Sequence, residues 1–107
     1  MTNFRALRLH KTETRAPAIQ IETLTADNLS IGNVLISNEY SSLNYKDALA
    51  VTGTGKIIRD FPMIPGIDAA GVVLQSDDPG FQQGEHVILT GHGVGETHTG
   101  GMAEQVR

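Results

Sequence analysis

The sequence contains no cysteine and no tryptophan, and aromatic residues make up only 5% of its 107 positions. Without cysteine, the chain cannot form a disulfide, a thiolate metal site or a cysteine nucleophile. With so few aromatics, its core must be largely aliphatic. Positive charge is also scarce, since 8 Lys and Arg residues face 12 Asp and Glu residues, for a net charge of −4. This balance argues against a surface dedicated to nucleic acid or an anionic membrane, which requires clustered positive charge.

The sequence also lacks any apolar run long enough for a signal peptide or a membrane-spanning helix. Its length fits one domain with one modest hydrophobic core. We therefore expect residues 1–107 to form a single cytoplasmic domain that binds neither nucleic acid nor a membrane.

Glycine is abundant, and 12 glycines and 4 prolines interrupt short apolar stretches in a pattern typical of a mainly β domain. A short helix is predicted over 45–51, capped by Ser42 or Asn44 and ended by the glycines of 52–55. The sequence Ala69-Ala70-Gly71 predicts close packing on its backbone. Alternating or β-branched residues predict strands over 4–10, 19–24, 34–40, 67–74 and 85–90, with a last strand beginning at 102.

Two glycine-containing segments raise the question of phosphate binding. The segment 91–95, GHGVG, follows a predicted strand, but Glu96 stands where the dinucleotide fingerprint requires a third glycine. Gly55 and Lys56 resemble the end of a P-loop, but Ile57 stands where that motif requires Ser or Thr. Glycines that serve loop conformations explain both segments better.

Three potential metal ligands, His92, Glu96 and His98, lie close together in the same segment. Their spacing matches no zinc pattern, and no predicted helix holds them on one face. We therefore expect a solvated loop here, without a metal site.

Four polar side chains stand together just before the predicted helix, in the segment Asn44-Tyr45-Lys46-Asp47. Tyrosine can donate a hydrogen bond to a developing oxyanion, aspartate can orient a group or relay a proton, and asparagine can fix a neighbour. The same residues can instead cap the helix, and the residues alone leave both interpretations open. We expect Asp47 to be partly exposed, at the start of the helix.

Asp68 is the second candidate for a functional carboxylate. It stands between apolar residues at the start of a strand that the sequence predicts to be buried. A buried carboxylate requires a partner, so Asp68 belongs either to a structural ion pair or to a functional site.

These motifs together resemble the N-terminal part of the medium-chain dehydrogenase/reductase superfamily, and most of all its zinc-free, quinone-oxidoreductase-like branch, which includes acryloyl-CoA reductases. The resemblance covers nearly the whole chain and is strongest over 41–104. It is carried by SSLNYKD at 41–47, GKIIRDFPMIPGID at 55–68, GEHV at 84–87 and TGHGVGE at 90–96.

The resemblance implies a mainly β fold, a GroES-like, partly open β-barrel with one or two short helices. It also implies an NADPH-dependent reductase of an activated double bond in an acryloyl-CoA-like thioester, or of a quinone. NADPH would be bound mainly by a Rossmann domain that this sequence does not contain, so we expect the chain to be a truncated N-terminal domain that is inactive alone. The alternative is a non-catalytic GroES-like binding or assembly module.

The branch also implies catalysis without zinc. Zinc-dependent relatives carry a cysteine after the third strand and a histidine at the start of the next buried strand, and both are absent here. In zinc-free relatives, Asn44, Asp47 and Asp68 match residues considered part of the active site, and Tyr45 matches one near the nicotinamide.

Two further expectations concern the surface. Relatives often carry tryptophan where this chain has His92 and Thr99, so we expect a different rim of the substrate cleft. The chain ends on 102–107, a strand just begun, whose unpaired edge predicts self-association into a homo-oligomer, most simply a symmetric dimer.

Overall fold

The computed structural model describes residues 3–107 and contains six strands and one α-helix. The helix, α1, spans Tyr45–Thr52, and a single 3-10 turn, η1, spans Ala26–Asn28. The strands are β1 (Phe4–His10), β2 (Ala18–Leu24), β3 (Val34–Tyr40), β4 (Asp68–Ser76), β5 (His86–Thr90) and β6 (Gln105–Val106). The predicted strands are therefore confirmed, although the last one is confined to two residues. No helix among residues 3–107 has the length and apolar character needed to cross a membrane.

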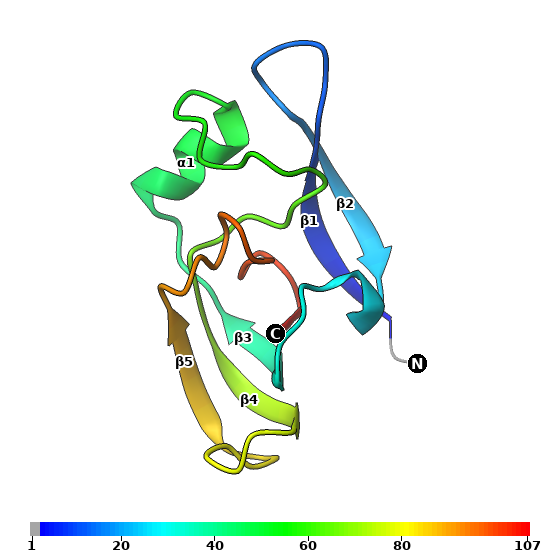
Figure 1. The fold of residues 1–107 in the computed structure, drawn as a ribbon, viewed down its shortest axis with the longest axis vertical. Helices are drawn as coiled ribbons and strands as arrows, with labels where there is room; N and C mark the ends of the chain where they lie inside the picture. Colours follow the sequence, from blue (N-terminus) through cyan, green and yellow to red (C-terminus); the bar gives the residue numbers. More distant parts are fainter. Residues whose placement is uncertain (1–2) are drawn as a thin grey trace.

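The strands form two antiparallel sheets that one segment joins (Figure 1). The first contains β1 and β2, and the second has the order β5-β4-β3-β6. Between them, the Leu7 N–H donates to the Met102 carbonyl at 2.9 Å, and the Glu104 N–H donates to the Arg5 carbonyl at 3.0 Å. Residues 102–106 therefore bridge β1 to β3, and β2 and β5 remain as edges that no strand of the described chain pairs. This is the predicted mainly β, partly open barrel.

The close packing predicted at Gly71 is present between β3 and β4. Gly71 lies opposite Asn38 in the antiparallel register. A Cβ atom at this position would meet the backbone carbonyl of Ser37. Only glycine lets the two strands approach this closely.

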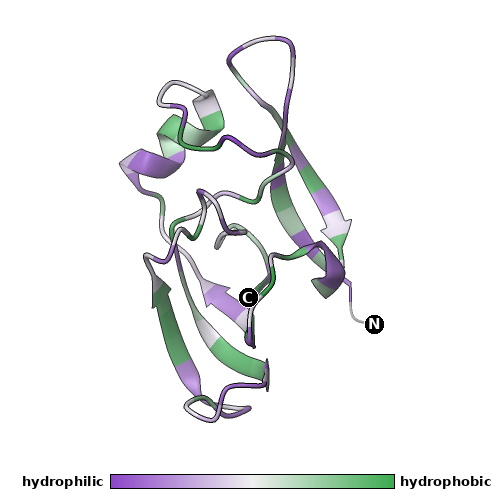
Figure 2. Cartoon of the chain, in the orientation of Figure 1, coloured by the Kyte–Doolittle hydropathy of each residue, from purple (hydrophilic) through white to green (hydrophobic). Residues whose placement is uncertain are grey.

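Helix α1 is capped by an asparagine at its start and by a glycine at its end. Asn44 is extended at the N-cap, with φ −122° and ψ 160°, and its N–H donates to the Asp47 carboxylate at 3.0 Å. Gly53 adopts a left-handed conformation at φ 74°, which ends the helix. Of the two caps that the sequence allowed, Asn44 is therefore the one used. In Figure 2 the helix is hydrophilic at its start and more hydrophobic further along.

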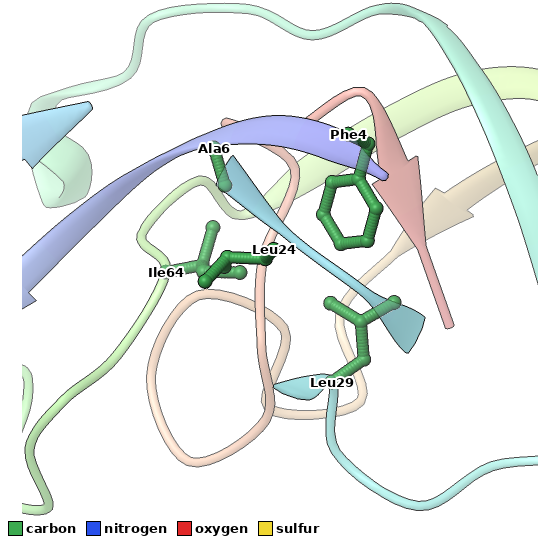
Figure 3. Packing of buried hydrophobic residues seen from close by; sticks show 5 residues of the cluster. All are labelled: Phe4, Ala6, Leu24, Leu29 and Ile64. Atoms are coloured by element: carbon green, nitrogen blue, oxygen red, sulfur yellow. The ribbon is translucent and has the colours of Figure 1, made fainter. Parts of the chain in front are cut away.

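The core contains almost no aromatic residue, as the composition predicts. One cluster comprises Phe4, Ala6, Leu24, Leu29 and Ile64 (Figure 3). A second comprises Leu9, Ala50, Ile58 and Met63, which together hold α1 against β1. This packing fixes the start of α1 relative to the sheets, and the candidate site lies there.

Candidate active site

The two segments that the sequence singled out meet where α1 and β4 begin. The Ile67 N–H donates to Asp47 Oδ1 at 3.1 Å, and Asn44 Nδ2 lies 3.3 Å from Asp68 Oδ2. Asn44, Asp47 and Asp68 therefore form one hydrogen-bonded cluster, although 24 positions separate its ends in sequence. Local capping and a shared polar site thus coexist at this junction.

Asp47 is buried, with only 2% of its surface exposed, so the predicted partial exposure is wrong. Its Oδ2 accepts the Asn44 backbone N–H at 3.0 Å and the Asn44 side-chain amide at 3.2 Å, while Oδ1 accepts the Ile67 N–H. The carboxylate is turned inward because these donors all lie on the protein side of the helix start. Asp47 therefore positions Asn44 and the chain before β4.

Asp68 is only half-buried, whereas the sequence predicted a buried carboxylate. The exposure follows from its place at the first position of β4. Its Oδ1 accepts the Ser42 N–H at 2.8 Å, and its Oδ2 accepts the Ser42 hydroxyl and the Asn44 amide. The Ser42 hydroxyl, followed by the Ser42 N–H, holds the pKa of the Asp68 carboxyl below its usual range. Asp68 is thus an ionised acceptor whose main partner is a serine.

Ser42 is the site residue whose role sequence reasoning missed, because it was considered only as a helix cap. Its Oγ also lies 3.1 Å from Asn44 Nδ2. The sequence signal that could have indicated this role is a serine, Ser42, two positions before Asn44. Its partner stands 26 positions further along the chain, which local patterns do not specify.

Tyr45 and Lys46 lie on the outer side of the same helix start. Tyr45 is 80% exposed, so its ring and hydroxyl are accessible to a ligand. The Lys46 ammonium pairs with the Glu96 carboxylate at 3.3 Å, which ties α1 to the glycine-rich loop 91–101. The site therefore combines an exposed phenol with a polar cluster whose members are held by one another.

The glycine-rich loop uses its own amide groups for internal hydrogen bonds. The N–H groups of Glu96, Thr97 and His98 all donate to the Gly93 carbonyl, at 2.9 to 3.1 Å. They are therefore not directed at a phosphate group, in agreement with the interpretation of these glycines as loop-forming residues. Among residues 3–107, no group of three or more His, Cys, Asp and Glu side chains is placed to hold a metal ion.

Thr99 does not lie at an exposed rim. It is 7% exposed, and it exchanges two hydrogen bonds of 3.0 Å with Ser30, one through each residue's backbone N–H and the other's hydroxyl. Thr99 therefore joins the loop to the chain before β3, because its short side chain reaches that backbone. Of the two positions expected to change the rim of the substrate cleft, Thr99 is therefore buried in this domain. His92, in contrast, is exposed and left-handed, at φ 56°.

Comparison with known proteins identifies the family. Residues 30–107 match the alcohol dehydrogenase GroES-like domain. The chain belongs to this family, the N-terminal domain of medium-chain dehydrogenases and reductases. It is 61% identical over 87 residues, or 81% of its length, to the "Probable acrylyl-CoA reductase AcuI" of Escherichia coli strain K12. It is 41% identical over 103 residues, or 96% of its length, to the "Putative quinone oxidoreductase YhfP" of Bacillus subtilis strain 168.

Solved structures show the same fold. The chain is similar to the yhdH oxidoreductase of Salmonella enterica, crystallised in complex with NADP, with a TM-score of 0.92 and 52% identity over 96% of the chain. That match covers 32% of the Salmonella chain. The chain likewise spans 27% of the Escherichia coli relative and 31% of the Bacillus subtilis relative. It therefore corresponds to less than a third of the relatives' length.

Proposed function

We propose that this chain is the substrate-facing domain of an NADPH-dependent oxidoreductase that reduces an activated carbon–carbon double bond in an acrylyl-CoA-like thioester, or a quinone. The observation that carries the proposal is the cluster of Ser42, Asn44, Asp47 and Asp68 beside the exposed Tyr45, in a chain 61% identical to a protein named as an acrylyl-CoA reductase. A purely structural cap does not require an exposed phenol at the same position.

The residues of this chain fit one end of the nicotinamide cofactor. Tyr45 is an exposed aromatic ring beside polar groups, which suits contact with a flat nicotinamide ring. The N–H groups of residues 94–98 donate within the glycine-rich loop and those of residues 99–101 donate to Ser30, Ile64 and Gly66, so this loop offers the pyrophosphate no comparable cradle. We propose that Tyr45 contacts the nicotinamide or the substrate, and that the phosphates are held outside this chain.

Reduction of an activated double bond adds a hydride to the β-carbon and a proton to the α-carbon, and we propose that solvent water beside the exposed Tyr45 supplies this proton. A bound reduced nicotinamide would supply the hydride. Asp68 is ionised, with a lowered pKa, so it is a poor proton donor at neutral pH. We propose that the Tyr45 hydroxyl donates a hydrogen bond to the substrate carbonyl oxygen, where negative charge develops. The hydrogen bonds among Asn44, Asp47 and Asp68 would hold the start of α1, and with it Tyr45, in position.

We propose that this chemistry proceeds without zinc. The chain has no cysteine, and the two segments that carry the cysteine and histidine ligands in zinc-dependent relatives read Asn44-Tyr45-Lys46-Asp47 and Gly66-Ile67-Asp68 here. Both Asp47 oxygens already accept N–H groups, so this donor set suits hydrogen bonding better than a tetrahedral metal site. One zinc per chain after washing with a chelator, measured by elemental analysis, would contradict this.

The two tyrosines of the chain provide a matched test in the complete enzyme. Tyr40 and Tyr45 are both exposed, at 75% and 80%, but only Tyr45 lies in the site. We expect Tyr45→Phe to lower kcat/KM for acrylyl-CoA about 10²-fold, and Tyr40→Phe to leave it unchanged. Equal activity of both variants would remove Tyr45 from the mechanism. Failure of the enzyme to oxidise NADPH with either acrylyl-CoA or a quinone would overturn the proposed function.

A further inference from the structure

Four of the basic residues of this chain lie in or near the loop 55–60 that follows α1. A hollow of about 450 Å³ beside α1 is lined by residues 55–57, 59–60 and 96–97, and Lys56 and Arg59 are among them. A neighbouring hollow of about 210 Å³ shares Lys56 and adds Arg15. Lys46 joins the group through Glu96, which lines the larger hollow. Four of the 8 basic residues thus surround one region of a chain whose net charge is −4.

Three of these cations have no anionic partner within residues 3–107. Arg15, Lys56 and Arg59 take part in none of the ion pairs there, which involve Arg5, Arg8, His10 and Lys46. Two carboxylates also line the larger hollow. Glu96 is paired with Lys46 at 3.3 Å, so only Asp60 opposes the free cations. The local charge is therefore positive, and an anion is the ligand that it suits.

The backbone at Lys56 supports a role for its side chain. Its φ is 50°, and within residues 3–107 only His92 is another non-glycine residue at positive φ. A lysine in this conformation costs more than a glycine would, so a strained lysine that lines both hollows points to a use for its ammonium group.

We infer that this hollow binds the phosphate groups of a coenzyme A thioester while its acyl end lies at Tyr45. The inference rests on the proposed function and narrows it, because a quinone carries no anionic end. The hollow extends from residues 55–57, which follow α1, to Glu96, which pairs with Lys46 at the start of the helix, and the 8 residues of α1 span about 12 Å. The flexible pantetheine arm of coenzyme A separates thioester from phosphates, so both ends can be held at once. Arg59 can bind a phosphate in a bidentate manner, and Lys56 adds a point charge.

The test is a binding titration of this chain, which needs no turnover and so stands apart from the proposed activity. Coenzyme A, 3′-dephospho-coenzyme A, pantetheine and inorganic phosphate are each added while the backbone amide signals of the chain are followed by NMR. We expect coenzyme A to shift the signals of residues 55–60 and 96–97 and to bind more tightly than its dephosphorylated form. Pantetheine should leave these signals in place, and added salt should weaken the coenzyme A effect.

Variants that remove a positive or a negative charge test whether coenzyme A binds through the positive charge of the hollow. Lys56→Gln and Arg59→Gln should each raise the Kd for coenzyme A about threefold or more, whereas Asp60→Asn should lower it. Arg5→Gln is the matched control, because it removes one exposed cation that lines a different hollow, and it should leave the Kd unchanged. All four side chains are exposed, so the variants should fold.

Four outcomes would overturn the inference, three in the titration and one in the complete enzyme. Shifts of equal size with inorganic phosphate and coenzyme A at equal concentrations would show a general anion site. Equal weakening by Arg5→Gln would show a nonspecific charge effect, and shifts confined to residues away from 55–60 and 96–97 would place coenzyme A elsewhere. Reduction of acrylyl-CoA by the complete enzyme, with Lys56→Gln leaving its KM unchanged, would leave the proposed function standing and reject this hollow alone.

Discussion

At the scale of single residues, the site depends on which carboxylate is open to solvent and which is enclosed. Asp47 accepts three N–H groups inside the protein, whereas Asp68 is half-buried and held mainly by Ser42. The exposures are the reverse of those expected from the sequence. Hydrogen-bond donors on the protein side hold the Asp47 carboxylate inside the protein, and its place in the first turn of α1 is one where the helix dipole stabilises negative charge.

Removal of the Ser42 hydroxyl should raise the pKa of Asp68 toward its ordinary value. The hydroxyl is the largest cause of the lowered pKa, and Ser42→Ala leaves only the backbone N–H and the Asn44 amide. The carbon-13 shift of the Asp68 carboxyl group, followed by NMR against pH, measures this directly. Ser42→Thr should restore the low pKa, and an unchanged pKa in Ser42→Ala would show that the hydroxyl does not hold this carboxylate.

The contact between Ser42 and Asp68 also determines how the stability of the folded chain changes with pH. Because the pKa of Asp68 is lower in the folded chain than in the unfolded chain, its contribution is present above the unfolded value, about 3.9. It is lost as the pH falls through the folded value. The Tm difference between wild type and Ser42→Ala should therefore be largest near neutral pH and shrink on acidification below about pH 4.

Asp47→Ala should unfold more easily than wild type, by about 1–3 kcal/mol, because it leaves the Asn44 and Ile67 N–H groups without their acceptor. Urea denaturation measures this change. Asp27→Ala removes an exposed carboxylate and should stay within about 0.5 kcal/mol of wild type. If Asp47→Ala keeps full stability while the complete enzyme loses turnover, the carboxylate acts on the substrate and the positioning role is refuted.

At the scale of elements, the approach of β3 to β4 places the start of β4 beside α1. Gly71→Ala should cost about 1–3 kcal/mol, since its methyl group would meet the Ser37 carbonyl. Gly80→Ala is the control, because its nearest neighbour is the flexible Asp78 carboxylate in an exposed turn at 3.2 Å. Comparable denaturation midpoints for the two variants would show that the strands can separate at Gly71 without loss.

At the scale of the whole molecule, self-association stays a prediction, but the edge expected to form the interface changes. The segment 102–106 was expected to expose an unpaired edge, yet Val106 is fully buried because the segment pairs with β1 and β3 at once. The edges left are β2 and β5. On β5, Ile88 is 80% exposed beside an apolar hollow of about 350 Å³ that Phe81 and Leu89 also line. An exposed apolar edge of this kind recruits other chains.

Ile88→Lys should therefore abolish the association of this chain with itself, while Ile21→Lys on β2, which replaces a residue 67% exposed, should leave it. Light scattering over a range of concentrations compares the two variants with wild type. A wild-type chain that is monomeric at every concentration would remove the prediction. Dissociation by Ile21→Lys alone would move the interface to β2.

The positions of the strands and the helix were predictable from the sequence because they depend on neighbours along the chain. Alternation predicted β1 and strand-forming residues predicted β3, both with the bounds that the structure has, and Asn44 and Gly53 marked the limits of α1. The absence of cysteine and tryptophan predicted an aliphatic core and a site without thiolate, since composition limits what any fold can assemble. The motif around Asn44 also indicated where polar chemistry gathers.

The tertiary structure alone decided what each polar group contacts. Ser42 reaches Asp68 across 26 positions, Thr99 reaches Ser30 across 69, and Lys46 reaches Glu96 from another element. The same packing buried the segment 102–106 and placed Arg15, Lys56 and Arg59 along two hollows that share Lys56. Burial, pairing and pKa depend on distances in space, and such distances arise only when segments remote in sequence pack together.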